Sequence, residues 1–137
     1  MRPTSTIYRL AKAGGEYNKL YAMLKRQSGE KAQGLFDFPT VVAVRGGEVI
    51  GFLATVKHEK AIICGPLVLR DGPNVFVGLR LLDAYERVLR AAGVKAYFTL
   101  VPESHKGELR LLEDGLSFKR MGVAKETREV GLYRELV

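Results

Sequence analysis

Apolar residues recur along this chain at two spacings, one typical of strands and one typical of helices. Between positions 41 and 69 the strand-like spacing forms three runs, at 41–44, 49–56 and 61–69. Gly46-Gly47 separates the first two runs, and a glycine pair supplies the positive φ angles that a tight hairpin turn needs. A second turn at 57–60 leads into the third run. The pattern therefore predicts an antiparallel meander of three strands.

A helical spacing of apolar residues occupies two segments, 16–27 and about 75–92. Gly93 is placed to cap the second helix, and the apolar run 95–101 follows. Because a strand, a helix and a further strand form a right-handed crossover, 95–101 should lie parallel to 61–69. Two pairs of opposite charge at spacing four predict an outward-facing polar side on the second helix: Asp83 with Arg87, and Glu86 with Arg90.

The other segments complete a single predicted α+β domain over residues 1–137. A short strand is expected at 7–10, and 29–37 is interpreted as a linker or a further short helix. Three more elements are expected towards the C-terminus: a short helix at 108–113 and closing strands at 116–123 and 129–137. The sum is a mixed central sheet of about six to seven strands with flanking helices.

The fourth strand in chain order, 61–69, is interrupted by Gly65-Pro66. Proline donates no hydrogen bond to a neighbouring strand and occurs in sheets mainly at edges or bulges. We therefore expect a kink or bulge that ends pairing on one side of this strand. The loop 71–74 then leads into the helix, whose first N–H groups are suited to an anion.

The net charge of +7 comes from 22 basic and 15 acidic residues spread along the chain. This favours anionic partners without choosing between nucleic acid and a phosphorylated small molecule. Nucleic acid is the less favoured of the two, because Arg87 and Arg90 have acidic partners and no recognition helix, zinc site or aromatic RNA-binding signature is present.

Cys64 is the one cysteine, and it lies inside an apolar run. We interpret it as a buried spectator rather than a catalytic thiol, and we expect no metal site. The sequence has neither a run of roughly 20 apolar residues nor the apolar segment of a signal peptide. These features predict a cytoplasmic protein with no membrane partner.

Three stretches, in this order, resemble the GCN5-related N-acetyltransferase (GNAT) superfamily. They are FPTVVAVRGGEVIGFLA, LVLRDGPNVFVGLRLLDAYERVLRAAGVKAYFTLV and LRLLEDGLSFKRMG. The first is similar to the central hairpin of that family, the second to its acetyl-CoA segment, and the third to its ending of short helix, glycine and aromatic strand. The resemblance extends over residues 16–137 and implies a GNAT-type fold, in which a parallel fourth and fifth strand splay apart.

In that family acetyl-CoA lies in the gap between the splayed strands, and its pantetheine amides bond to strand backbone. The resemblance places the expected cofactor contacts on Leu67, Val68, Leu69, Arg70, Asn74, Val75, Phe76, Val77 and Gly78. The family's diphosphate loop usually has Gln or Arg, then Gly, then Gly or Ala. Here Pro73, Phe76 and Gly78 occupy these positions, so only the last glycine is present and the Phe76 ring could obstruct a diphosphate.

Acetyl transfer to an amine needs a group that takes the amine proton and an acid that protonates the leaving thiolate. The family's usual acid is a tyrosine four residues before the glycine of the short helix, where this chain has Leu111. Three other polar residues near the fifth strand are catalytic candidates: Ser104, His105 and Tyr97. No glutamate lies clearly on the fourth strand, so the usual base is not visible.

The resemblance therefore implies an N-acyltransferase that moves an acetyl group from acetyl-CoA to an amine of a small molecule or a protein. The alternative is a catalytically inactive GNAT-fold binding or structural protein. Short virion proteins of some tailed phages have a similar ending, here Ser104-His105 ahead of Gly115 and Phe118, so a virion location stays open under that alternative. A homo-oligomer stays open under both.

Overall fold

The computed structural model describes residues 5–28 and 36–136. Within these residues the strands are β1 (Thr6–Leu10), β2 (Asp37–Arg45), β3 (Glu48–His58), β4 (Ala61–Leu69), β5 (Ala96–Pro102), β6 (Lys119–Val123) and β7 (Glu129–Glu135). The helices are α1 (Gly15–Ser28), α2 (Val75–Ala91) and α3 (Lys106–Arg110), and α3 continues into a π-helical turn, η1 (Leu111–Gly115). The seven described strands form one mixed sheet in the spatial order β1-β2-β3-β4-β5-β7-β6.

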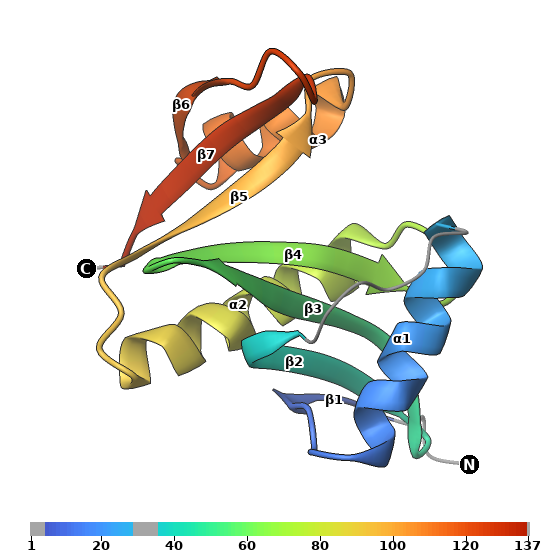
Figure 1. The fold of residues 1–137 in the computed structure, drawn as a ribbon. Helices are drawn as coiled ribbons and strands as arrows, with labels where there is room; N and C mark the ends of the chain where they lie inside the picture. Colours follow the sequence, from blue (N-terminus) through green and yellow to red (C-terminus); the bar gives the residue numbers. More distant parts are fainter. Residues whose placement is uncertain (1–4, 29–35, 137) are drawn as a thin grey trace.

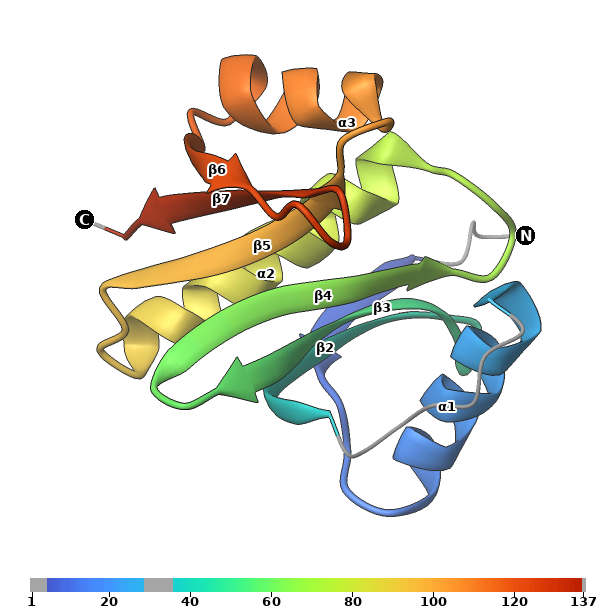
Figure 2. The same ribbon diagram turned by 45° about the horizontal axis from the view of Figure 1, so that its top comes forward.

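The helices cover both faces of the sheet (Figures 1 and 2). The apolar side of α1 packs on one face, where Leu20 and Met23 meet Phe52 and Val68. On the opposite face α2 and α3 share a larger core, built around Leu81, Tyr85, Leu89, Tyr97, Leu109 and Phe118. No helix in the described part of the chain is long and apolar enough to cross a membrane.

The antiparallel meander predicted from the sequence is confirmed. Strand β2 pairs with β3 around the Gly46-Gly47 turn, where both glycines have positive φ, and β3 pairs with β4. The second turn is tighter than expected, because β3 continues to His58 and only Glu59 and Lys60 remain outside the strands. Most of the predicted linker at 29–37 lies outside the described residues.

A bulge interrupts β4 at the Gly65-Pro66 step, as the sequence predicted. Cys64 pairs with Thr55 and Leu67 with Leu53, so two residues of β4 stand opposite one residue of β3. An extra residue reverses the alternation of side chains between the two faces of a sheet.

The consequence of the bulge is visible in the two cores. Cys64 faces the α2 side, and Leu69, five positions later, also packs against that core. Val68 in turn faces α1. Without the extra residue, Leu69 would point to the α1 side of the sheet and Val68 would lose its place under α1.

The predicted crossover is also confirmed, since β4 and β5 are parallel. The closing strand β6 begins later than expected, at Lys119 rather than at position 116. The chain still bonds back to the π-helical turn before that point, because the N–H of Phe118 donates to the carbonyl oxygen of Leu112 at 2.9 Å. Ser117 also has a φ of 60°, which is incompatible with an extended strand.

The outward position expected for Glu86 is wrong. Glu86 is only 5% exposed, and its carboxylate faces β5 and β7 rather than solvent. The Asp83–Arg87 pair does lie on the surface as expected, with a distance of 2.8 Å between Arg87 Nη2 and Asp83 Oδ2.

Candidate functional site

The parallel strands β4 and β5 separate within a few residues, and this separation defines the candidate site. They pair only at Ile63 with Phe98 and at Cys64 with Thr99, and β4 then continues for five residues without pairing to β5. Figures 1 and 2 show the two strands diverging from this point towards the start of α2. We call the paired part the closed end and the divergent part the open end.

A hydrogen bond from the Thr99 side chain to the β4 backbone marks the last contact of the closed end. The hydroxyl of Thr99 donates to the carbonyl oxygen of Cys64 at 3.0 Å, which satisfies the backbone group that faces β5 just before the bulge. Beyond this bond each strand carries an accessible apolar side chain, since Leu67 of β4 and Leu100 of β5 are each 47% exposed. The closed end therefore stops abruptly at the Gly65-Pro66 step.

The backbone of β4 presents alternate residues to β3 and to the open end. Arg70 N–H donates to the carbonyl oxygen of Ile50 at 2.8 Å, which fixes the alternation. Val68 therefore directs its polar groups to β3, whereas Leu67 and Leu69 direct theirs away from β3. The carbonyl oxygen of Leu69 is already engaged, because it accepts from Nε2 of Gln27 at the end of α1 and, at 3.5 Å, from the Gly72 N–H.

The start of α2 follows directly on the open end. Asn74 caps the helix, since its side-chain oxygen accepts from the Val77 N–H at 3.2 Å. The N–H of Gly78 bonds to the Asn74 carbonyl oxygen. Gly78 lies next to β4, since a Cβ added there would make ordinary van der Waals contact with the Leu67 side chain at 3.6 Å. A small cavity of about 100 Å³ lies beside this turn, lined in part by Asp71, Gly72, Pro73 and Asn74.

The Phe76 ring does not fill the open end. Phe76 and Val75 are each 63% exposed, and the Arg80 guanidinium stacks over the Phe76 ring with 5.0 Å to its centroid. Arg70, another expected contact, is held by carboxylates: its guanidinium bonds to Glu48 at 2.9 Å and to Asp71 at 3.1 Å. Of Arg70 and Arg80, the two cations that the sequence offered as sources of charge at this loop, only Arg80 contacts the Phe76 ring.

Ser104 and His105 lie just beyond the end of β5, at the start of α3, and both are exposed. His105 Nδ1 is 3.3 Å from Glu108 Oε2, so a carboxylate orients the ring. Leu111, at the position of the family's tyrosine, lies in the π-helical turn and has no polar group to offer. The structure thus places Ser104 and His105 beyond the last residue of β5, on the side of the open end where β4 and β5 have diverged most, and not at the closed end. We call this the wide side of the open end.

Tyr97 is a poor candidate for proton transfer because it is fully buried. Its hydroxyl donates to Glu86 Oε2 at 2.5 Å. Burial raises the pKa of the Tyr97 hydroxyl well above its usual value, and the bond to Glu86 raises it further. Cys64 is buried as expected, and burial likewise raises the pKa of its thiol.

Glu86 is the polar residue that sequence analysis misplaced. Its carboxylate also accepts from Arg134 Nη1 at 2.9 Å and lies 3.7 Å from Arg90 Nη2. A second buried contact joins Tyr85 and Thr55, whose hydroxyl oxygens are 2.6 Å apart. In the described residues no group of three or more His, Cys, Asp or Glu side chains is placed to hold a metal ion.

No protein-family model matches the chain, and no curated protein matches it either. Solved structures do match over almost the whole chain. The chain is similar to an aminoglycoside 6′-N-acetyltransferase from Enterococcus faecium, with a TM-score of 0.75, 12% identity, and coverage of 96% of this chain and 97% of the other. The chain has the GNAT fold. This confirms the fold that the resemblance implied, including the parallel, splayed pair.

Two further structures with the GNAT fold are informative. A ribosomal-protein-S18-alanine N-acetyltransferase from Escherichia coli matches with a TM-score of 0.71 and 15% identity, over 96% of this chain and 93% of the other. An acetyltransferase structure from Salmonella typhimurium contains its cofactor acetyl-CoA and matches with a TM-score of 0.72 and 14% identity, over 96% and 94%. At such identities the likeness shows the fold alone.

Proposed function

We propose that the chain is an N-acyltransferase that moves an acetyl group from acetyl-CoA to an amine. The observation that carries the proposal is the end of β4–β5 pairing after Cys64. Beyond this point β4 offers the backbone groups of Leu67 and Leu69 to an extended ligand, in the way that a sheet edge accepts an added strand. The acetyl-CoA in the similar Salmonella typhimurium structure supports the choice of ligand.

In this proposal the pantetheine amides of acetyl-CoA bond to Leu67 and Leu69. The diphosphate lies at the start of α2, near Asn74, Val75 and Phe76, where the helix dipole favours an anion. Val68, Val77 and Gly78 support this surface by packing rather than by polar contact, since the polar backbone group of each is directed to β3 or already bonded. Arg70 contributes little charge here because two carboxylates hold it.

The chemistry joins the amine nitrogen to the thioester carbonyl carbon, and the bond from that carbon to sulfur breaks. The amine nitrogen loses one proton and the thiolate gains one. Strand β4 carries no acidic or basic side chain between Ala61 and Leu69, so the amine proton leaves to water. Ser104 and His105, on the wide side of the open end, are the proposed proton donors to the thiolate, with Glu108 orienting the imidazole.

Calorimetric titration with acetyl-CoA tests the proposal, and one binding site per chain is expected. Leu67→Glu places a negative charge beside the proposed path of the anionic cofactor and should weaken binding at least tenfold. Val56→Glu is the matched control, because Val56 is 46% exposed on β3, away from the open end. It should change the affinity less than twofold.

Absence of binding at millimolar acetyl-CoA would overturn the proposal and favour a GNAT-fold binding or structural protein without this activity. Equal weakening by Leu67→Glu and Val56→Glu would place the ligand elsewhere on the chain. If acetyl-CoA binds as expected, acetylation of candidate amines follows. Small amines and protein N-termini are the first acceptors to try, because similar structures include an aminoglycoside and a ribosomal-protein-alanine N-acetyltransferase.

A further inference from the structure

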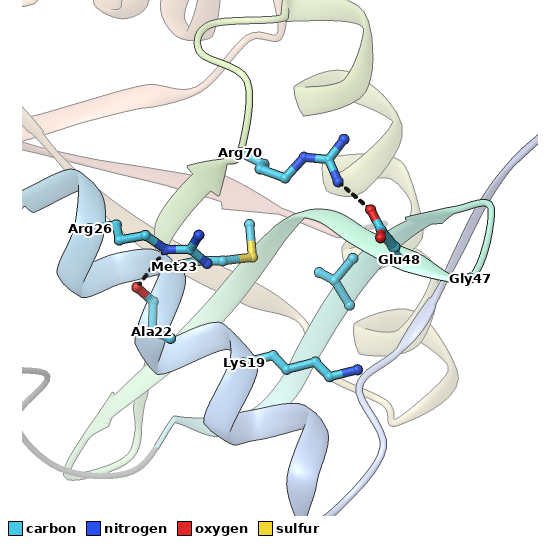
Figure 3. Close-up of a pocket in the computed structure, with 8 residues that line it drawn as sticks. Lys19, Ala22, Met23, Arg26, Gly47, Glu48 and Arg70 are labelled. Carbon is cyan, nitrogen blue, oxygen red and sulfur yellow. Dashed lines mark hydrogen bonds and ion pairs between the residues drawn. The ribbon is translucent and has the colours of Figure 1, made fainter.

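A second cavity lies on the α1 side of the sheet, opposite to α2. Its volume is about 320 Å³, which is within the range of small-molecule sites. It is formed by one side of α1, the turn between β2 and β3, and the end of β4 (Figure 3). None of the acetyl-CoA contacts proposed above lines it except Arg70.

The cavity combines an apolar floor with a charged rim, which holds three cations and one carboxylate, that of Glu48 paired with Arg70. Met23 and Val49 supply apolar surface, and Met23 belongs to the core beneath α1. Three cations line the rim: Lys19 and Arg26 from α1, and Arg70, which directly follows β4 (Figure 3). An apolar body with an anionic end is the ligand shape that fits such a lining.

The three cations differ in how far the protein already neutralises them. Arg70 is bonded to Glu48 and Asp71. Arg26 uses only Nε, which donates to the Ala22 carbonyl oxygen at 3.4 Å, and Lys19 makes no polar contact within the described residues. Two positive charges, those of Lys19 and Arg26, are therefore available to a ligand, and a phosphate monoester carries about −1.5 to −2 at neutral pH.

We propose that this cavity binds an organic phosphate, with the phosphate between Lys19 and Arg26 and the apolar body against Met23 and Val49. An arginine and a lysine bind phosphate through charge-assisted hydrogen bonds. The site is distinct from the proposed acetyl-CoA site although Arg70 borders both, because its other lining residues come from α1, the β2–β3 turn and the start of β3, and α1 and α2 lie on opposite faces of the sheet. Its occupancy does not depend on whether the chain transfers acetyl groups.

Titration with phenyl phosphate and with inorganic phosphate tests the proposal. Phenyl phosphate should bind about tenfold more tightly, since its ring covers apolar surface that inorganic phosphate leaves in water. The double variant Lys19→Gln/Arg26→Gln should weaken phenyl phosphate binding at least tenfold. Lys25→Gln is the matched control, an exposed cation on the same helix that does not line the cavity, and should change binding less than twofold.

Four outcomes would overturn the proposal. These are absence of phenyl phosphate binding at millimolar concentration, equal weakening by the double variant and by Lys25→Gln, benzoate binding as tightly as phenyl phosphate, and displacement of phenyl phosphate by acetyl-CoA. Displacement would mean that the phosphate had entered the acetyl-CoA site instead. Unchanged phenyl phosphate affinity in Leu67→Glu would show that the two sites are independent, whatever the result with acetyl-CoA.

Discussion

The two ends of the β4–β5 pair are built on opposite principles. At the closed end every buried side-chain polar atom in the described structure has a partner: Tyr97 bonds to Glu86, Glu86 to Arg134, and Thr99 to the Cys64 backbone. At the open end, a few residues along the same strands, Leu67 still lies opposite Leu53 of β3 but has no pairing to β5, and Leu67 and Leu100 are half exposed.

This difference shows how one sheet separates stability from binding. Buried polar groups stabilise a protein only when they are fully partnered, and the closed end meets that condition. Unpaired strand edges are usually covered or avoided. The open end retains one, which is the feature that a ligand with its own amide groups can use. We therefore expect substitutions at the closed end to change stability and substitutions at the open end to change binding.

The largest expected effect is on stability, at the closed end. Glu86→Ala leaves the buried Tyr97 hydroxyl without its partner and breaks the ion pair with the partly exposed Arg134, and should lower the free energy of unfolding by about 3 kcal/mol. Asp83→Ala is the matched control on the same helix. Its ion pair with Arg87 is exposed, so it should cost less than about 1 kcal/mol. Urea unfolding at neutral pH measures both. A cost for Glu86→Ala no larger than that of Asp83→Ala would contradict the contrast between the two ends.

Much of this architecture could be predicted from the sequence. The Gly46-Gly47 turn, the crossover and the bulge at Gly65-Pro66 depend on local backbone preferences, and local preferences can be read from neighbouring residues. The burial of Glu86 could not be predicted in this way. The Glu86–Arg90 spacing indicated an exposed pair, but the dominant partners, Tyr97 and Arg134, come from distant strands that only the fold brings together.

The candidate site was also predictable in part: its position could be predicted, but some of its contacts could not. The splay and its position followed from the proline in the fourth strand and from the resemblance. The engagement of the Leu69 carbonyl by Gln27 was not predictable, because it joins residues 42 positions apart in sequence. The outward position of the Phe76 ring, stacked with Arg80, depends on the exact start of α2, which sequence patterns leave uncertain by a few residues.

The second expected effect concerns catalysis at the open end and rests on the proposed acetyl transfer. His105→Ala should lower kcat about 100-fold, as is typical when a proton donor is removed, with little change in KM. Because Glu108 orients the imidazole, Glu108→Gln should lower kcat less than His105→Ala does. His58→Ala, at an exposed position at the end of β3, is the control. An unchanged kcat in His105→Ala would mean that the thiolate takes its proton from another source.

A third prediction concerns the stability of the fold in acid, which we expect to depend on the Arg9–Glu16 ion pair, outside both ends of the β4–β5 pair. Arg9 holds the Glu16 carboxylate through two hydrogen bonds, and this lowers the pKa of Glu16 to about 2. A carboxyl pKa that is lower in the folded state stabilises the fold above the unfolded pKa, and the contribution is lost as the pH falls towards the folded pKa.

Glu16→Gln should therefore cost about 2 kcal/mol at pH 7. That difference from the unsubstituted chain should shrink between about pH 5 and about pH 2. Urea unfolding across this range measures it, with Glu126→Gln in the exposed β6–β7 turn as the control. If the difference stays constant with pH, the Arg9–Glu16 pair does not carry the acid sensitivity.

The smallest expected effect tests whether the open end is held partly occupied by the protein itself. Gln27 donates to the Leu69 carbonyl oxygen, the same group that a pantetheine amide would use in the proposed complex. Gln27→Ala should therefore tighten acetyl-CoA binding about threefold, because exchange of one neutral hydrogen bond is worth roughly 0.5–1.5 kcal/mol. Lys25→Ala, on the same turn of α1, should leave the affinity unchanged. Weaker acetyl-CoA binding in Gln27→Ala would show instead that the bond from α1 to β4 is needed for the open end to keep its shape. Binding at the open end would then depend on structural contacts, and the division between a stabilising closed end and a binding open end would be less sharp.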